Sequence, residues 1–133
     1  MKRIVLIALR DPEGKVLLQH KDAAAPNNPN TWCLFGGQIE PDESMEEAAG
    51  RELSEELEIQ ADNLKFLGHK IDIDKDIERF YLSAWIDLSA EILKKQQHEG
   101  DDLGFFSMDE IKSMQKMNPA HQEAVIEYLG KAD

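Results

Sequence analysis

Apolar and polar residues alternate in short runs along the N-terminal part of the chain, which is the pattern of β-strands. Ile4 to Leu9 and Lys15 to His20 are two such runs, and the turn-forming segment Asp11-Pro12-Glu13-Gly14 between them predicts a hairpin. After a Pro- and Asn-rich loop, Thr31 to Phe35 predicts another strand, which ends at Gly36-Gly37.

The pattern then changes to that of a helix. Ser44 and Glu47 have the spacing of a capping box, and good helix formers continue to Leu57. Leu64 to Ile73 and Arg79 to Leu88 follow as two runs typical of strands.

The C-terminal part has weaker signals. The polar segment Lys94 to Asp102 predicts a loop, and Phe105-Phe106 predicts a short strand. Two helices are then predicted over residues 107–117, opened by a capping box, and residues 118–129, opened by an Asn-Pro N-cap. No repeat or linker interrupts the chain, so we expect one α/β (α+β) domain over residues 1–133, with a mixed sheet and helices packed against it.

Composition narrows the class of partner. The 133 residues are 41% hydrophobic, which is enough for a packed core, and 27 acidic against 15 basic residues give a net charge of −12. This charge argues against sustained binding to a nucleic acid polymer or to an anionic membrane. A small anionic substrate remains compatible with the charge if cations are supplied locally.

Cys33 is the only cysteine, so the chain has no intrachain disulfide and no cysteine zinc cluster. We therefore expect a reducing, cytoplasmic setting. No apolar run has the roughly 20 residues of a membrane helix. The oligomeric state is left open by the sequence, and a homodimer is one expectation.

Three carboxylates of the first helix lie at spacings that place them on one face. Glu52, Glu55 and Glu56 stand at i, i+3 and i+4, at about 100° per residue. One interpretation is a solvated acidic face. The other is a cation site, because Ala48 and Ala49 share this stripe and carboxylates at a partly buried face need cations such as Mg²⁺ or Mn²⁺.

The same segment resembles the Nudix box. Its glycine, glutamates, arginine and final apolar residue match at the family's spacings, at Gly37, Glu43, Arg51-Glu52, Glu55-Glu56 and Ile59. The strand and double glycine before the box agree as well, and the order of elements extends the resemblance over nearly the whole chain. The departure is Glu58, where the family has a glycine that ends the helix in a left-handed conformation.

The resemblance implies a Nudix-like α/β/α sandwich and a hydrolase that uses Mg²⁺, or Mn²⁺, to cut a phosphoanhydride in a nucleoside diphosphate derivative. It implies metal binding by Glu52, Glu55, Glu56 and the carbonyl of Gly36. Arg51 belongs to the same candidate catalytic set, and its expected role is to brace the loop and helix by pairing with the box glutamate before it.

Three residues outside the box are candidates with two interpretations each. Glu99 is either a further metal ligand or base from a loop, or ordinary loop charge. Lys21 either meets substrate phosphate or is a solvated strand end, and His121 either approaches the base or is a surface histidine.

Two functions from different classes remain. The first is a hydrolase of a nucleoside triphosphate, oxidised or not, or of a nucleotide sugar or dinucleotide. The second is a catalytically silent Nudix-fold module that binds a nucleotide and regulates another process. The intact box glutamates favour the hydrolase, because a silent binder has no need of three mutually repelling carboxylates.

Overall fold

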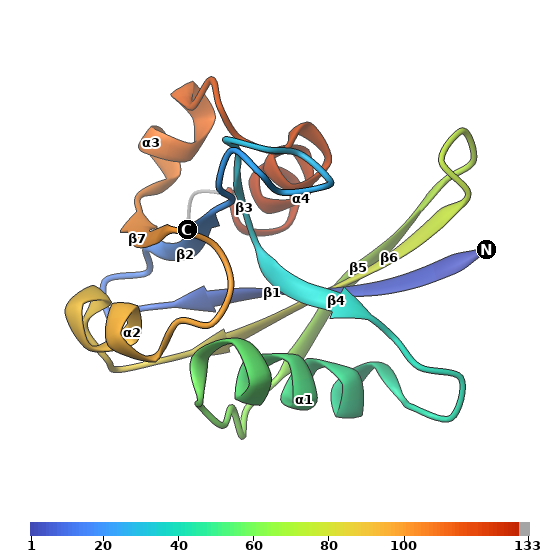
Figure 1. Cartoon of the computed structure of the whole chain (residues 1–133), viewed down its shortest axis with the longest axis horizontal. Helices are drawn as coiled ribbons and strands as arrows, with labels where there is room; N and C mark the ends of the chain where they lie inside the picture. Colours follow the sequence, from blue (N-terminus) through green and yellow to red (C-terminus); the bar gives the residue numbers. More distant parts are fainter. Residues whose placement is uncertain (131–133) are drawn as a thin grey trace.

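A computed structural model describes residues 1–130. It contains seven strands and four helices (Figure 1). In chain order they are β1 (Lys2–Arg10), β2 (Val16–His20), β3 (Trp32–Cys33), β4 (Phe35–Gln38), α1 (Met45–Leu57), β5 (Lys65–Asp72), β6 (Ile77–Trp85), α2 (Ala90–Gln96), β7 (Asp102–Phe106), α3 (Met108–Ser113) and α4 (Pro119–Leu129).

Strand β1 organises a mixed sheet. One of its edges pairs in parallel with β6, which in turn pairs with β5. Its other edge is shared, because β4 covers the segment Ile4 to Ile7 while β2 joins only at the pair Arg10–Val16. Strand β2 carries β3 and β7. The sheet therefore opens between β1 and β2, and the chain from β3 to β4 crosses this opening.

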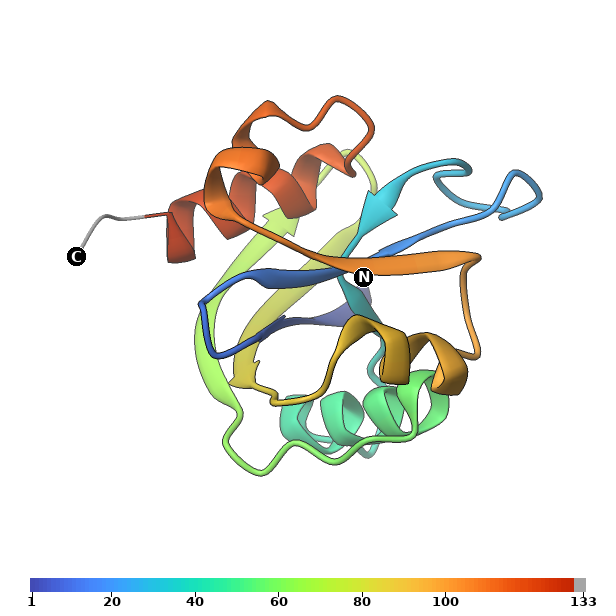
Figure 2. The ribbon, with the colours of Figure 1, turned by 90° about the vertical axis from the view of Figure 1, so that its left-hand side faces the viewer.

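The alternation in β1 places apolar side chains on both faces of the sheet. Val5, Ile7 and Leu9 belong to a core with α1 and α2, whereas Leu6 and Ala8 belong to a core with α3 and α4. Figure 2 shows the resulting layers, with α1 and α2 on one side of the sheet and α3 and α4 on the other. The expected α/β/α sandwich is confirmed. Within residues 1–130 no helix has the length and apolarity needed to cross a membrane.

Helix α1 begins and ends as the sequence indicates. The Ser44 hydroxyl accepts from the Glu47 amide and the Glu47 carboxylate accepts from the Ser44 amide, which completes the capping box. At the other end Glu58 has φ 56° and ψ 39°, the left-handed conformation that the family glycine implies. A non-glycine residue in this conformation costs roughly 1 kcal/mol.

The strand predicted over 31–35 is two strands. Trp32–Cys33 pairs with β2, Leu34 is a break, and Phe35–Gln38 pairs with β1, so the double glycine lies inside β4 and not after the strand. The break exists because the chain changes partner strand at the opening of the sheet. Sequence periodicity carries no information about such a change of partner.

Two predictions for the C-terminal part are wrong. Residues 90–96 form helix α2, although the segment from Lys94 was predicted as loop; the Ser89 hydroxyl caps this helix at the Ile92 amide, and Leu93 is buried beneath it. Helix α3 ends at Ser113 and not near residue 117, because the backbone of residues 116–118 instead pairs with Trp32.

Candidate functional site

The inner face of α1 carries a carboxylate without a partner. Glu56 is 4% exposed, and neither of its carboxylate oxygens has a hydrogen-bond partner within residues 1–130. Burial, followed by the nearby carboxylates of Glu52 and Glu99, raises the pKa of Glu56 to about 10. A buried ionised carboxylate is costly unless a cation or donors meet it, so this position favours a bound cation.

Glu52 lies one turn before Glu56 and packs against the double glycine of β4. Its side chain is 14% exposed, and its carboxylate occupies the space that a side chain at Gly37 would need. A side chain at Gly36 would collide with the Val5 carbonyl of β1. Both glycines therefore allow α1 and β1 to approach β4 closely, which brings the Gly36 backbone beside the carboxylates.

Arg51 braces the loop before α1, as predicted. Its Nε and Nη2 donate to the two carboxylate oxygens of Glu43 at 2.7 and 2.9 Å, Nη1 donates to Glu52 Oε1 at 2.9 Å, and Nη2 donates to the Gln38 carbonyl at 3.0 Å. The hydrogen bonds from Arg51 lower the pKa of Glu43 to about 2. The guanidinium thus ties the loop, β4 and the helix together, and it neutralises part of the acidic cluster.

The remaining two predicted acidic ligands lie farther out. The Glu55 side chain is 60% exposed and lies 3.5 Å from Arg51 Nη1, and Glu99 is exposed on the loop between α2 and β7. Among residues 1–130, no three His, Cys, Asp or Glu side chains already surround one cation position. The structure therefore brings together Glu52 and Glu56. The hard oxygen donors of this pair, one of them buried without a partner, fit Mg²⁺ or Mn²⁺.

The loop that carries Glu99 is fixed to the site at both ends. The His98 amide donates to the Glu56 carbonyl at 2.8 Å, and the Asp101 amide donates to the His20 carbonyl at 2.9 Å. His20 Nδ1 also lies 2.7 Å from Asp101 Oδ1. Glu99 is exposed overall, but partial desolvation of its carboxyl group by the surrounding chain raises its pKa; Glu52 raises this pKa further, and Lys21 lowers it. The backbone of this loop thus holds Glu99 in the electrostatic field of the α1 carboxylates.

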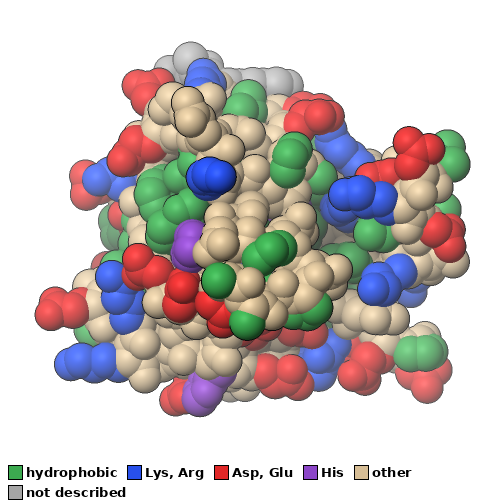
Figure 3. Space-filling view, turned by 45° about the horizontal axis from the view of Figure 1, so that its top comes forward, with side chains coloured by type: hydrophobic (Ala, Val, Ile, Leu, Met, Phe, Trp, Pro, Cys, Tyr) green, Lys and Arg blue, Asp and Glu red, His purple; other side chains and the backbone are tan. Residues whose placement is uncertain are grey.

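A cavity of about 430 Å³ opens beside these carboxylates, where β1 and β2 separate. Gly36, Gly37, Lys21 and Glu99 border its acidic end. The rest of its wall comes from strands β1, β2, β3 and β6, the loop after β2, the turn before β6 and the start of α4. These segments contribute Lys2, Ile4, Leu6, Gln19, Pro26, Asn27, Asn28, Cys33, Leu34, Lys75, Ile77, Arg79, Asn118 and His121. Figure 3 shows Lys and Arg side chains among acidic ones at the end of the molecule where the β5–β6 hairpin lies.

His121 is buried in the wall of this cavity, so the interpretation as a surface histidine is wrong. It is 8% exposed, and its Nδ1 accepts a hydrogen bond from the Leu34 amide at 3.2 Å. Burial, assisted by Arg79 and Lys21, lowers the pKa of His121 to about 3. The ring is therefore neutral, and because Nδ1 accepts, its hydrogen is on Nε2.

Lys21 follows the end of β2 and lines the cavity, and no carboxylate lies within ion-pair distance of it among residues 1–130. Sequence reasoning missed two other polar residues of the wall, Gln19 and Arg79, both of which are buried. Gln19 Oε1 has no hydrogen-bond partner in the described chain, while its Nε2 donates to the Leu34 carbonyl at 3.4 Å. The signal for Gln19 was present, since it is a polar residue in an otherwise apolar buried strand.

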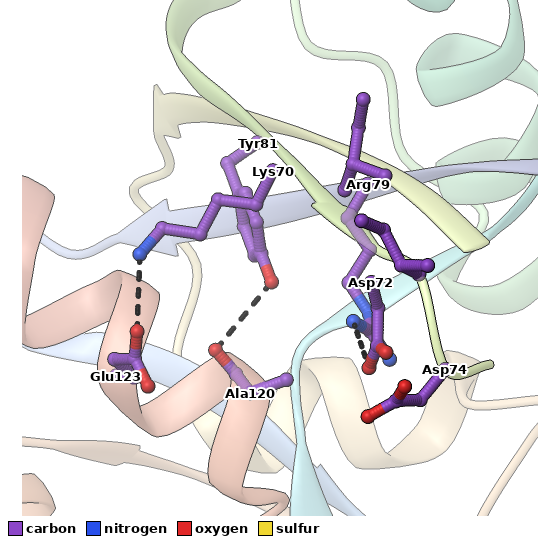
Figure 4. Close-up of a pocket in the computed structure, with 9 residues that line it drawn as sticks. Lys70, Asp72, Asp74, Arg79, Tyr81, Ala120 and Glu123 are labelled. Atoms are coloured by element: carbon purple, nitrogen blue, oxygen red, sulfur yellow. Dashed lines mark hydrogen bonds and ion pairs between the residues drawn. The ribbon is translucent and has the colours of Figure 1, made fainter. Parts of the chain in front are cut away.

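A second cavity, of about 500 Å³, lies between the β5–β6 hairpin and α4. Figure 4 shows two ion pairs in its wall: Lys70 Nζ lies 3.3 Å from Glu123 Oε1, and Arg79 Nη1 lies 3.5 Å from Asp72 Oδ2. Lys70 also pairs with Glu127 at 2.8 Å. The remaining charged residue of the wall, Asp74, has no ion pair in the described chain but is exposed to solvent. In contrast to Glu56, no buried charge of this cavity lacks a partner.

The fold and site together define an α/β/α sandwich protein that holds one buried and one largely buried carboxylate, Glu56 and Glu52, near a cavity of about 430 Å³. A family model described as the NUDIX domain matches residues 1–129, so the chain belongs to the Nudix family. Nudix hydrolases generally use divalent metals and act on small-molecule nucleotide substrates.

Several known proteins are similar. A CTP pyrophosphohydrolase of Escherichia coli (strain K12) is 37% identical over 87 residues, which span 64% of this chain and 62% of that relative. Among solved structures, a MutT protein from Methanosarcina mazei Go1 has a TM-score of 0.81 at 22% identity over 96% of this chain and 91% of that one. The E. coli ORF135 protein has a TM-score of 0.68 at 27% identity, over 100% and 96%.

Proposed function

We propose that this protein is a divalent-cation-dependent pyrophosphohydrolase that cuts a phosphoanhydride bond in a nucleotide. The observation that carries the proposal is the buried, unpartnered carboxylate of Glu56 beside Glu52. A hydrophobic residue would be more stable at this position unless a cation binds there. Membership of a family of metal-using hydrolases supports the same conclusion.

Mg²⁺ is the proposed cation, and Mn²⁺ is the proposed substitute. Glu52 and Glu56 would hold it, with Glu55, Glu99 and the Gly36 carbonyl as the further candidate ligands, since their oxygens are of the kind that these hard ions prefer. When bound, such an ion neutralises a diphosphate and lowers the pKa of a coordinated water.

The chain's own residues supply binding and orientation. Lys21 lines the cavity, lowers the pKa of Glu56 by its charge and has no ion pair in the described chain, so its ammonium can meet a phosphate oxygen. Neutral His121 can donate from Nε2 to an acceptor on the base. A cavity of about 430 Å³ is within the range of small-molecule sites, and it accommodates one compact nucleotide.

The reaction is a hydrolysis that balances with water alone. The water oxygen forms a bond to phosphorus, the bond from that phosphorus to the bridging oxygen breaks, and the electron pair leaves with the departing phosphate group. Glu99 or one of the α1 carboxylates takes the proton of the water. Arg51 acts at a distance, because its guanidinium is occupied by Glu43, Glu52 and the Gln38 carbonyl.

Nucleoside triphosphates are the proposed substrate class, and CTP and its deoxy form come first because a relative at 37% identity is a CTP pyrophosphohydrolase. A triphosphate would be cut to the nucleoside monophosphate and pyrophosphate. A cytoplasmic location is proposed with this substrate, and the buried Cys33 is compatible with it, since burial raises the pKa of the thiol to about 12 and leaves it unreactive.

The proposal is tested by a hydrolysis screen over canonical and oxidised nucleoside triphosphates, nucleotide sugars, dinucleoside polyphosphates and ADP-ribose, with products identified by chromatography. We expect Mg²⁺-dependent release of a monophosphate and pyrophosphate from a triphosphate. Glu56→Gln should abolish this release, whereas Glu46→Gln, on the exposed start of the same helix, should keep it. Tight nucleotide binding without turnover by the wild-type protein would instead establish the silent binding module.

A further inference from the structure

Strand β5 is the outer strand of the sheet. It pairs with β6 on one side, and within residues 1–130 no backbone group pairs with its other side. Figure 2 shows β5 at the left-hand edge of the sheet. An unprotected edge strand is a template for pairing with a further strand.

The exposed edge carries two large apolar side chains. Phe66 is 48% exposed and Ile71 is 53% exposed. They are the exposed large apolar side chains of β5, and their positions along the strand decide whether they can meet a second copy.

A bulge places these two side chains on the same face of the sheet. The register with β6 skips one residue between Phe66 and Gly68. Phe66 is opposite Leu82 of the α1-side core, and His69 stacks on Phe80, so both lie on the α1 side. Ile71, two residues after His69, lies on that side as well.

Lys65 and Asp72 lie on the opposite face. Lys70 marks this face, because its ammonium pairs with Glu127 of α4, and Asp72 follows it by two residues. Lys65 directly precedes Phe66 in the strand, and successive side chains of a strand point to opposite faces. Lys65 therefore lies on the same face as Lys70 and Asp72. Lys65 has no ion pair among residues 1–130, so its charge is available.

This arrangement is self-complementary. Two copies of β5 can pair antiparallel about a two-fold axis at His69, with Leu67 left unpaired in the bulge as it is in the pairing with β6. In this register Phe66 of each copy lies opposite Ile71 of the other copy. In the same register Lys65 of each copy lies opposite Asp72 of the other. Each pair consists of residues on the same face, as an antiparallel ladder requires. The apolar pairs and the charge pairs therefore match in a single register.

We propose that the protein forms a symmetric homodimer by antiparallel pairing of β5 with β5 of a second copy, centred on His69. The interface continues the sheet across both copies, and its contacts are the two apolar pairs, the two charge pairs and the backbone ladder. The cavity beside Glu56 lies between β1 and β2 and stays open in this dimer.

The test uses sedimentation velocity of the full chain at about 100 µM, with two charge-reversed variants. Lys65→Asp alone places like charges opposite each other at both charge pairs, and so does Asp72→Lys alone. We expect each variant to raise the dimer dissociation constant at least about tenfold. An equimolar mixture of the two variants restores both attractive pairs and should form a heterodimer. Lys112→Asp, on the exposed surface of α3, is the matched control and should dimerise as wild type does.

A second pair of variants keeps the test independent of Asp72, which also contacts Arg79. Phe66→Asp and Ile71→Lys should each give monomers, and their mixture should give a heterodimer. Circular dichroism of each variant checks that it is folded. A monomeric wild-type protein at this concentration, or a dimer that persists in the single variants, overturns the proposal. So does a mixture that remains monomeric although both variants are folded.

Discussion

Helix α1 and the loop before it carry two groups of charged side chains, which differ in whether the chain itself provides partners for the charges. At its outer side, Arg51 is surrounded by acceptors, and the Glu43 carboxylate receives two of its hydrogen bonds. At its inner side, Glu56 is more deeply buried, yet neither oxygen has a partner in the described chain. Arg51 and Glu56 are five residues apart, which is about one and a half turns of the helix.

The difference distinguishes a structural charge from a functional one. A folded chain that buries a carboxylate without a partner loses stability, so the position is explained by a ligand that meets the charge. The Arg51 group is complete without a ligand. The second cavity supports the same distinction, because the charges of Lys70 and Arg79 are met by carboxylates of the chain.

The largest expected effect is on Glu56. Glu56→Gln should lower kcat by about 10² to 10³, the scale seen when one preorganised electrostatic group is removed. In the absence of divalent cations and at neutral pH, the variant should be roughly 1 to 3 kcal/mol more stable than wild type. Folding of wild type must protonate Glu56, whose pKa is raised to about 10, whereas glutamine is neutral in both states. Steady-state kinetics and urea unfolding measure the two effects. A variant with full activity would contradict the assignment.

The next prediction concerns the buried ring of His121, whose Nδ1 can accept the hydrogen bond from the Leu34 amide only when the ring is neutral. Its pKa is lowered to about 3 in the folded protein, against about 6.5 when unfolded, so its contribution to stability is complete above pH 6.5 and is lost as the pH falls toward 3. Between pH 7.5 and 5.0 this loss is about 2 kcal/mol. His121→Asn keeps an acceptor for the Leu34 amide and should remove this component from the pH dependence of urea unfolding. Equal pH dependence in both proteins would show that His121 is not held neutral.

Substitutions of two residues at the mouth of the cavity, Lys21 and Glu99, should change different kinetic parameters. Lys21→Ala should raise KM, since a phosphate contact acts on the ground state and the transition state alike, whereas Glu99→Gln should lower kcat at least about tenfold. Both are measured at saturating Mg²⁺ on the best substrate. If Glu99→Gln turns over like wild type, the Glu99 carboxylate is loop charge only.

The smallest effect is expected at the end of α1. Glu58→Gly should raise the free energy of unfolding by roughly 0.5 to 1 kcal/mol, because glycine adopts the left-handed conformation at no steric cost. The gain is limited because the Glu58 carboxylate also contacts His98. Denaturant unfolding measures it, and a loss of stability would show that the His98 contact outweighs the backbone strain.

Local signals predicted much of the fold. The capping box at Ser44 correctly predicted the start of α1. The family pattern has a glycine at the position of Glu58, which predicted a left-handed residue there, and Glu58 has this conformation in the structure. Helix α2 was not predicted because only one of its seven residues, Leu93, is buried, which leaves no helical pattern of apolar residues. Its packing also depends on contacts with residues distant in the sequence, such as the hydrogen bond from Gln96 Nε2 to the Leu57 carbonyl.

The site was predictable where it lies on one helix and less so elsewhere. Glu52 and Glu56 follow from helical spacing, and so does the pairing partner of Arg51 within the box. The burial of His121 depends on Leu34, a residue of a distant strand, and the place of Arg79 in the cavity wall depends on how β6 pairs with β1. Such contacts are set by the topology of the sheet, which periodicity does not report.

The central claim is that Glu56 lacks a partner because it binds a divalent cation. Electron paramagnetic resonance of free Mn²⁺, titrated with the protein in the absence of nucleotide, measures this binding directly. We expect wild type and Glu46→Gln to take up Mn²⁺ with the same affinity, and Glu56→Gln to bind at least about tenfold more weakly. Binding by Glu56→Gln that equals wild type, or no uptake by the wild-type protein, would contradict the account.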